Sequence, residues 1–379
     1  MLKTAQTNLT EGVINLAVGH PSLPMLPLRE MEQAAAHRFA QGNAEFLQYG
    51  YEWGDGYLRT ELAAFLTQEY SVPVQADDLF ISGGVSQALD LICAMLTEPG
   101  DTIIVEDPTY FFSFNIFRNH RLNILTAPVD EHGLDVDALE GLLEQHKPKL
   151  IYTIPTHQNP SGVTLSDERR ERLVRLAQQH DFYVMADEVY HLLTFEGTPP
   201  RSFSGWVDSG RVLSLGSFSK ILAPGTRLGW IHAPHALLER LAQNGMIVSG
   251  GGFSPLGGGL IRSMIELGLL PPYIQKLRGT FQRRAHVMAD ALGELRPLGL
   301  EFQRPQGGYF IWVTLPDGLN GDDLLSAALQ RGVRFQPGNL FSPQGTQGNK
   351  LRLCFAFYEE EELRGGVQRL EQAILAMMR

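Results

Sequence analysis

A lysine stands in an unusual neighbourhood at residues 217–230, which read SFSKILAPGTRLGW. Surface lysines usually have charged or amide neighbours, because the ammonium group is strongly hydrated and costs free energy to bring under apolar cover. Lys220 instead lies between two serines and a run of apolar and small residues, with Arg227 downstream. Its amine could bind an aldehyde, and the serines and the arginine could bind an anion. Taken alone, Lys220 would more often be an ordinary surface residue.

The segments that follow other expected strands also deliver groups that could bind a ligand. Runs rich in β-forming residues at 78–82, 101–107, 149–155, 182–188, 211–217 and 228–233 alternate with amphipathic helical segments, which predicts βαβ units. Ligands of parallel sheets bind outside the carboxyl ends of the strands. Five of these ends are followed, in chain order, by GGVSQ at 83–87, Tyr110, Asn159, Asp187 with Tyr190, and Lys220.

Each of these groups also has an ordinary structural explanation. GGVSQ could form a tight strand-to-helix turn, and Tyr110 could be a core aromatic residue with a satisfied hydroxyl. Asn159 belongs to NPSG, a common turn sequence, and Asp187 could cap a helix together with Glu188. Their order and their shared edge of the sheet favour a single site instead.

Together the groups describe one ligand. The helix that opens after the glycines at 83–84 can hold a phosphate with its backbone N–H groups. Tyr110 can cover a planar ring, Asp187 can pair with a protonated ring nitrogen, and Asn159 can donate to a phenolic oxygen. Lys220 can bind an aldehyde. This combination predicts pyridoxal 5′-phosphate as the cofactor, and no metal is expected.

The pattern of elements predicts an α/β protein of two domains. With 379 residues, the chain exceeds the roughly 250 to 300 at which a single core stops growing. A large cofactor-binding domain with a mostly parallel sheet flanked by helices is expected over residues 40–275. A long helical segment at 273–295 then leads into shorter elements of both kinds. It predicts a smaller α+β domain formed by residues 1–39 and 276–379.

Composition narrows the classes of partner. The formal net charge of -11 argues against nucleic acid or an anionic membrane surface. No run reaches the roughly 18 apolar residues of a membrane span, and the first residues lack the apolar core of a signal peptide. Cys93 and Cys354 lie in apolar runs, so both are expected to be buried thiols. We therefore expect a cytoplasmic protein.

The chain also resembles a known family, the class I/II aminotransferases of fold type I, over nearly its whole length. The matching stretches are LQYG at 47–50, SGGVSQALDL at 82–91, EDPTY at 106–110, THQNPSG at 156–162, DEVY at 187–190, SFSKILAPGTRLGW at 217–230 and LRLCFAF at 351–357. Their order and spacing make the resemblance highly specific. It implies the fold of the type I pyridoxal-phosphate enzymes and a homodimer with shared active sites.

The resemblance implies a role for each matching residue. Lys220 would form a Schiff base with the cofactor and later serve as general base, and Asp187 would pair with the pyridine nitrogen. Asn159 and Tyr190 would hydrogen-bond the phenolic oxygen, and Tyr110 would stack on the ring. The phosphate ligands would be Gly84, Val85, Ser86, Ser217, Ser219 and Arg227, with Tyr49 reaching the phosphate of the neighbouring subunit.

Arg352 is the implied ligand of the substrate α-carboxylate, with Gly19 lining that pocket and Asn159 beside it. A strand period of two places Arg352, Cys354 and Ala356 on one face of LRLCFAF. An arginine at such a position could also form an internal ion pair. With the resemblance, bidentate binding of a carboxylate is the better interpretation.

Two features depart from the usual pattern of the family. Many relatives carry Ser-Gln where this chain has Val85 and Ser86, so one phosphate hydroxyl is missing and only backbone donors are expected there. The segment 246–259, MIVSGGGFSPLGGG, is unusually rich in glycine. We interpret it as a mobile loop whose small residues allow close packing, and we assign it no ligand.

The expected activity is transamination by a ping-pong mechanism, in which one amino acid leaves its amine on the cofactor and a 2-oxo acid collects it. A C–S β-lyase is the nearest alternative, because one fold hosts several reactions. A transcriptional regulator would place a basic winged-helix segment ahead of this fold, whereas the resemblance begins near Ile14. A nicotinamide dehydrogenase would need G-x-G-x-x-G, which SGGVSQ does not match.

The substrate side chain is left open by the sequence. A side-chain carboxylate would need a second cation, for which Arg29 is one candidate and an exposed helix charge the equally good alternative. Tyr51, Phe111 and Phe112 could line a pocket for bulky side chains. Dicarboxylic, aromatic and branched-chain amino acids all remain candidates.

Overall fold

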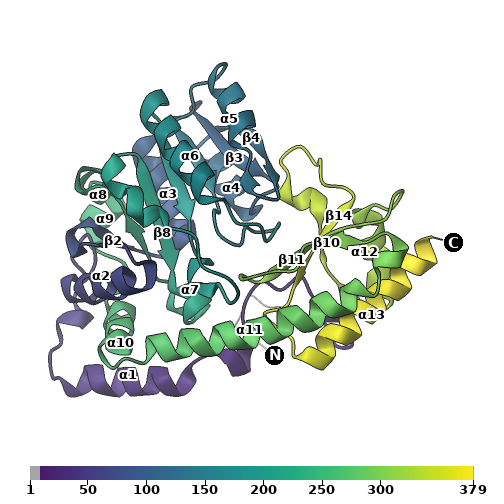
Figure 1. Cartoon of the computed structure of the whole chain (residues 1–379). Helices are drawn as coiled ribbons and strands as arrows, with labels where there is room; N and C mark the ends of the chain where they lie inside the picture. Colours follow the sequence, from purple (N-terminus) through teal and green to yellow (C-terminus); the bar gives the residue numbers. More distant parts are fainter. Residues whose placement is uncertain (1–8, 379) are drawn as a thin grey trace.

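The larger part of the chain is built around an eight-stranded sheet of order β2-β9-β8-β7-β6-β3-β4-β5 (Figure 1). The computed structural model describes residues 9–378. Its strands in this sheet are β2 (Leu79–Ser82), β3 (Thr102–Asp107), β4 (Asn123–Asp130), β5 (Gly133–Leu134), β6 (Leu150–Thr153), β7 (Tyr183–Asp187), β8 (Val212–Ser217) and β9 (Gly229–His232). From β8 through β4 neighbouring strands are parallel, which confirms the expected mostly parallel sheet.

Two parts of this sheet differ from the sequence-based expectation. β9 runs antiparallel to both of its neighbours, because the connection from β8 holds only short helical turns and the chain returns directly. β4 was not expected at all. Most of its residues are only partly buried, so it lacks the apolar run that marks the central strands.

Helices cover both faces of the large sheet (Figure 1). Side chains alternate between two cores, so that Ile103 and Val105 of β3 enter one and Ile104 enters the other. α6 shows how a covering helix is fixed, since Ser166 caps its first turn and Asp181 ends it in the left-handed region. The covering helices are α3 (Val85–Leu96), α4 (Phe112–Asn119), α5 (Val136–Leu143), α6 (Asp167–His180) and α8 (His235–Ala242), and the short helix α7 (Phe218–Ile221) follows the end of β8.

A smaller lobe contains an antiparallel sheet of order β10-β11-β14-β13 and a short parallel pair of β1 with β12. Its elements are β1 (Ile14–Asn15), β10 (Glu301–Phe302), β11 (Phe310–Thr314), α12 (Gly321–Gln330), β12 (Val333–Arg334), β13 (Gln336–Pro337), β14 (Lys350–Cys354) and α13 (Glu360–Met377). The long helix α11 (Leu270–Gly293) joins the two parts and packs along α13 (Figure 1). This division of strands supports two domains, but the boundary at 275, which α11 crosses, stays a prediction.

The glycine-rich segment 246–259 is largely helical, so its interpretation as a loop was wrong. Residues 246–250 belong to α9 (Gly245–Gly250), and residues 255–259 open α10 (Pro255–Glu266). The expected close packing is present, because Gly252 pairs with Gly50 and a Cβ atom on Gly252 would collide with the carbonyl oxygen of Tyr51. The remaining helices and 3₁₀ turns are α1 (Leu28–Ala40), α2 (Gly56–Tyr70), η1 (Leu23–Met25), η2 (Glu45–Leu47), η3 (Ala76–Asp78), η4 (His191–Leu193), η5 (Phe203–Ser209), η6 (Pro224–Thr226), η7 (Arg296–Leu298) and η8 (Gly338–Phe341).

Two other features of the described chain bear on the expectations from composition. Cys93 and Cys354 are buried and unpaired, which confirms them as buried thiols. Across residues 9–378, no helix is both long and apolar enough to cross a membrane.

Candidate functional site

The predicted lysine is half-buried and lies where the two lobes meet. Ser217 ends β8 and caps the short helix α7, which carries Lys220. Lys220 Nζ donates a hydrogen bond of 2.9 Å to the carbonyl oxygen of Gly19, and the same nitrogen lies 5.4 Å from the centre of the Tyr309 ring. Desolvation by burial lowers the pKa of Lys220 to about 8, and the positive charge of Arg352 acts in the same direction. Lys220 is therefore a lysine whose neutral amine is accessible near neutral pH.

Asp187 supplies a buried carboxylate at the end of β7, the strand next to β8. The residue is 4% exposed, and Tyr152 Oη donates a hydrogen bond of 2.8 Å to its Oδ2 atom. Burial raises the pKa of Asp187 to about 6, while the hydrogen bond from Tyr152 and the charge of Lys220 act against that rise. No α-helix begins at Asp187, so this residue is not a helix cap, which was the alternative explanation for it. A cation placed against this carboxylate would stabilise its charged form.

Arg352 lies on β14 and reaches across to the large sheet. Its Nη1 donates to Asn159 Oδ1 at 2.8 Å and its Nη2 donates to the carbonyl oxygen of Ala17 at 3.0 Å. The guanidinium carbon lies 4.0 Å from the ring centre of Phe310 and 5.0 Å from that of Phe341. Arg352 is 4% exposed, and its Nε atom is buried without a hydrogen-bond partner.

The charge of Arg352 is not neutralised by a carboxylate in the part of the chain that the structure describes. Burial lowers its pKa, and the groups that raise it are Cys354, Tyr190 and Tyr110, none of which is a carboxylic acid. The alternative of an internal ion pair therefore fails for residues 9–378. A buried guanidinium with an unpaired nitrogen is suited to an external carboxylate.

The predicted phosphate ligands meet at the start of α3. Gly84 has φ +88°, in the left-handed region, and a Cβ atom there would lie 3.2 Å from Arg227 Nη2. Arg227 Nη2 itself donates to the carbonyl oxygen of Gly83 at 3.2 Å. Val85 and Ser86 are the first residues of α3, where backbone N–H groups have no partner inside the helix. A helix N-terminus and an exposed arginine at this place offer hydrogen-bond donors that can hold an anion.

The two serines on either side of Phe218 differ in burial and in the hydrogen bonds that their hydroxyl groups make. Ser217 Oγ accepts a hydrogen bond of 3.1 Å from the backbone N–H of Ser219 and lies 3.3 Å from the carbonyl oxygen of Leu228, to which it donates. Ser217 is buried, whereas Ser219 is half-buried. Ser217 is the last residue of β8, and Ser219 belongs to α7, the short helix that carries Lys220.

Two tyrosines enclose the same region. Tyr110 is half-buried, and burial raises its pKa, as does the charge of Asp187, whereas the charge of Arg352 lowers it. Tyr190 is 3% exposed, and its ring centre lies 5.5 Å from that of Tyr309. Both hydroxyl groups are therefore protonated near neutral pH and can donate hydrogen bonds.

Tyr49 is the one predicted residue that stands apart. Its side chain is 85% exposed, and within residues 9–378 no hydrogen bond or ring contact joins it to the other predicted residues. The structure thus brings Gly19, Lys220, Asp187, Asn159 and Arg352 together within one subunit but leaves Tyr49 on the surface.

Sequence reasoning missed four contributors to this region: Tyr152, Tyr309, Phe310 and Phe341. Tyr152 pairs with Met185 across the sheet, which places its hydroxyl beside the carboxylate two residues further along β7. Tyr309 donates to the carbonyl oxygen of Lys220 at 3.0 Å. Tyr309 and Phe310 stand in the apolar run GGYFIWVTL, but only three-dimensional pairing shows what these aromatic residues contact.

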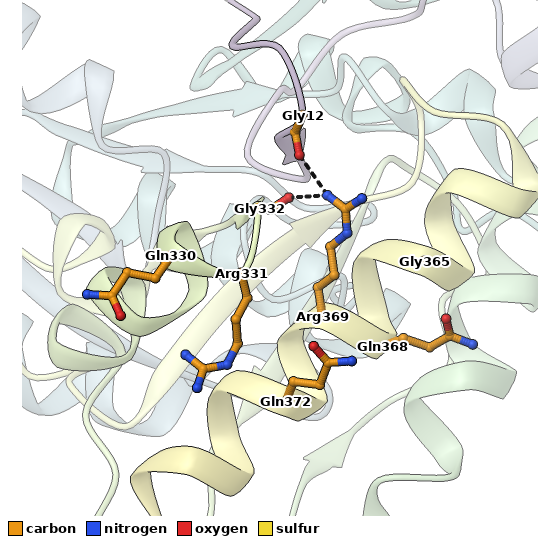
Figure 2. Close-up of a pocket in the computed structure, with 8 residues that line it drawn as sticks. All are labelled: Gly12, Gln330, Arg331, Gly332, Gly365, Gln368, Arg369 and Gln372. Carbon is orange, nitrogen blue, oxygen red and sulfur yellow. Dashed lines mark hydrogen bonds between the residues drawn. The ribbon is translucent and has the colours of Figure 1, made fainter.

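A separate recess of about 640 Å³ lies on the smaller lobe and shares no lining residue with the predicted site (Figure 2). Arg369 from α13 points to the carbonyl oxygens of Gly12 and Gly332 and donates to both, at 2.8 and 2.7 Å. Arg331 donates to the carbonyl oxygen of Ala327. These arginines have structural partners, so we assign the recess no ligand.

Comparison with known proteins identifies the family. The model of the family "Aminotransferase class I and II" matches residues 11–370. An aromatic-amino-acid aminotransferase of Thermococcus litoralis is 36% identical, and the alignment covers 98% of this chain and 90% of that protein.

Two solved structures are similar over nearly their whole length. A multiple-substrate aminotransferase from Thermococcus profundus has a TM-score of 0.91 at 35% identity, covering 97% of this chain and 93% of that one. A kynurenine aminotransferase from Pyrococcus horikoshii, solved in complex with PMP, has a TM-score of 0.92 at 33% identity, with 98% and 92% coverage.

The chain therefore belongs to the class I and II aminotransferases, and its fold is that of the fold type I members. It is an aminotransferase, and its substrates are an amino acid and a 2-oxo acid. The alternative of a β-lyase finds no support among these relatives.

Proposed function

We propose that this aminotransferase works with pyridoxal 5′-phosphate held through Lys220, and that its amino-acid substrates carry bulky, uncharged side chains, aromatic ones above all. The observation that carries the cofactor proposal is the pair of groups at the ends of β7 and β8. Asp187 is a buried carboxylate and Lys220 a half-buried amine, and each shifts the pKa of the other toward its charged form.

The residues present fit this cofactor. Burial raises the pKa of Asp187, and no ion pair joins its carboxylate to another side chain within residues 9–378; a protonated pyridine nitrogen would supply the cation. Arg227 and the opening of α3 offer donors to a phosphate, and Gly84 leaves room where a Cβ atom would press on Arg227. When bound, the cofactor would supply the electron sink for the reaction at the substrate Cα atom.

The protein residues would supply binding, orientation and proton transfer. Tyr152 would keep the Asp187 carboxylate oriented through its hydrogen bond of 2.8 Å. Lys220, with its pKa lowered to about 8, would take up and return the proton at the substrate Cα atom. Arg352 would hold the α-carboxylate with the help of Asn159. Tyr110 would cover the ring, and Tyr190 would donate to its phenolic oxygen.

The surroundings of Arg352 support a bulky, uncharged side chain. Phe310 and Phe341 flank the guanidinium group, and Phe111 contacts Phe341 edge-on with ring centres 5.1 Å apart. Arg29, the candidate for a second cation, is exposed. A side-chain carboxylate brought into these aromatic surroundings would lose hydration without gaining an ion pair. The aromatic-amino-acid and kynurenine aminotransferases named above support the same substrate class.

A comparison of amino donors tests the substrate class. With one fixed 2-oxo acid, we expect kcat/KM for phenylalanine and tyrosine to exceed that for aspartate by roughly 100-fold, because an unpaired carboxylate at the aromatic wall costs a few kcal/mol. Leucine should fall between them. Steady-state rates with purified protein provide the measurement. An equal or higher kcat/KM for aspartate would contradict the proposed class.

The homodimer with shared active sites and the cytoplasmic location also stay proposals. Exposed apolar side chains lie on two segments that the Gly50–Gly252 bridge connects, Leu47 and Tyr51 on one and Met246 and Val248 on the other, and exposed apolar surface of this kind suits a subunit interface. In a two-fold dimer, Tyr49 could then reach the phosphate of the neighbouring subunit. A monomeric mass by light scattering, together with full activity, would refute this arrangement.

A further inference from the structure

Hydrogen bonds at the end of β3 connect the large sheet to the smaller lobe, and they involve residues to which no role has been assigned above. The carboxylate of Asp107 accepts three hydrogen bonds from the segment that connects η8 to β14. Ser342 Oγ and Thr346 Oγ1 each donate to Asp107 Oδ2 at 3.0 Å, and Gln347 Nε2 donates to Oδ1 at 3.3 Å. We call this set of four residues the Asp107 latch.

The connecting segment is folded around the same hydroxyl. The backbone N–H groups of Gln344 and Thr346 donate to Ser342 Oγ, both at 3.3 Å, while Ser342 donates to Asp107. The donors to Asp107 are all uncharged, and no ion pair involving Asp107 occurs in the described part of the chain. The latch therefore depends on short-range hydrogen bonds with correctly placed donors rather than on a long-range attraction of opposite charges.

The latch ends beside the residue that covers the carboxylate site. Phe341 directly precedes Ser342, and its carbonyl oxygen accepts a hydrogen bond of 2.9 Å from the N–H of Thr109, two residues after Asp107. The Phe341 side chain is fully buried, and its ring centre lies 5.0 Å from the guanidinium carbon of Arg352. Residues 107–109, at the end of β3, thus hold residues 341–347 of the smaller lobe beside the Arg352 site.

We propose that Asp107 is a positioning residue for substrate binding, which acts by latching residues 342–347 and so holding Phe341 against Arg352. The inference rests on the proposed role of Arg352 as the ligand of the substrate α-carboxylate. Because both substrates of a transamination carry that carboxylate, loss of the latch weakens the binding of the amino acid and the 2-oxo acid together. The cofactor site at Asp187 and Lys220 does not contact the latch.

Two variants remove the latch from opposite sides. Asp107→Ala removes the acceptor, and the double variant Thr346→Val/Gln347→Ala removes two donors while leaving β3 and the backbone turn around Ser342 intact. Asp107→Asn should rescue in part, since an amide keeps one acceptor and the hydroxyls can accept from its N–H₂ group. Asp101→Ala is the matched control, because Asp101 caps the turn before β3 at the other end of the strand.

On the cofactor-loaded enzyme, hydrogen exchange tests whether the latch holds residues 342–347, and steady-state kinetics test whether the latch affects substrate binding. We expect amide exchange in residues 338–347 to accelerate in both latch variants, since a local opening then costs less free energy. KM for amino acid and 2-oxo acid should each rise roughly tenfold, with kcat and the cofactor absorption changed little. The control should show neither effect.

The outcomes separate the latch from the proposed function. Unchanged exchange in the double variant would overturn the latch, and this variant carries the test if Asp107→Ala does not fold. Faster exchange with unchanged KM values would overturn the positioning role. If Arg352 is not the carboxylate ligand, replacing Arg352 leaves both KM values unchanged although exchange in the latch variants still accelerates.

Discussion

Lys220→Ala is expected to lower the rate of transamination by about 10³-fold or more, because it removes the group proposed both to bind the cofactor aldehyde and to move the proton at the substrate Cα atom. The loss should appear in kcat with saturating cofactor. The visible absorption of the cofactor–lysine linkage should also be absent from this variant. Rates and absorption spectra of the purified variant provide the measurement.

Two comparisons make the Lys220 result specific. Lys220→Arg keeps a positive charge beside Asp187 but offers no amine that reacts with an aldehyde, so it should be as inactive as the alanine variant. Lys276→Ala, which replaces an exposed lysine of α11, should behave as the wild type. Retention of more than a tenth of the activity in Lys220→Ala would mean that another group performs the chemistry.

Arg352→Ala is expected to raise KM for both the amino acid and the 2-oxo acid by roughly 10- to 100-fold, since hydrogen bonds to a charged group contribute about 1.5 to 3 kcal/mol. The visible cofactor band should still form, because Arg352 contacts Asn159 and Ala17 and makes no hydrogen bond to Lys220 or Asp187. Arg352→Lys should recover only part of the affinity, as a lysine cannot bind a carboxylate in bidentate fashion.

The control for Arg352 is Arg334→Ala, which removes an exposed arginine from β12 of the same lobe. It should leave both KM values as they are. A rise for one substrate alone would point to a side-chain contact instead of a shared carboxylate ligand. Unaltered KM values in Arg352→Ala would refute the role of Arg352 as ligand of the substrate α-carboxylate.

Much of the site could be predicted because its residues follow strand ends. Asp187 and Lys220 come directly after buried apolar runs, and parallel neighbours must place such residues at one edge. The role of Gly84 at the start of a helix could be predicted for a similar reason, because a strand followed by two glycines and a helix leaves few alternatives for the backbone.

Other contributors depend on pairings that a local pattern does not contain. Tyr152 looks like any aromatic strand residue until its register with β7 places it beside Asp187. Asp107 meets Ser342 and Thr346 across 235 and 239 positions of the chain, and nothing near either segment signals the contact. Tertiary packing decides such pairs, and local propensity does not.

The strand that sequence reasoning overlooked shows the same limit. β4 pairs with β3 but is itself only partly buried, so its residues lack both the continuous apolar run of a central strand and a clean alternation. The glycine-rich segment failed in the opposite way. Its glycines suggest irregular backbone, but the residues of α9 and α10 on either side of 251–254 are helical. Gly251 and Gly252 are small because the chain around Gly50 passes close to them.

The central claim is that this chain takes the amine of an amino acid onto a cofactor bound at Lys220, and a single half-reaction tests it most directly. The purified protein, loaded with pyridoxal phosphate, is mixed with phenylalanine in the absence of any 2-oxo acid, and its absorption spectrum is followed. We predict that the visible band disappears as the pyridoxamine form accumulates, with one equivalent of phenylpyruvate per site, and that it returns on adding a 2-oxo acid. A band that never converts with any amino acid, or no band after loading, would contradict the account.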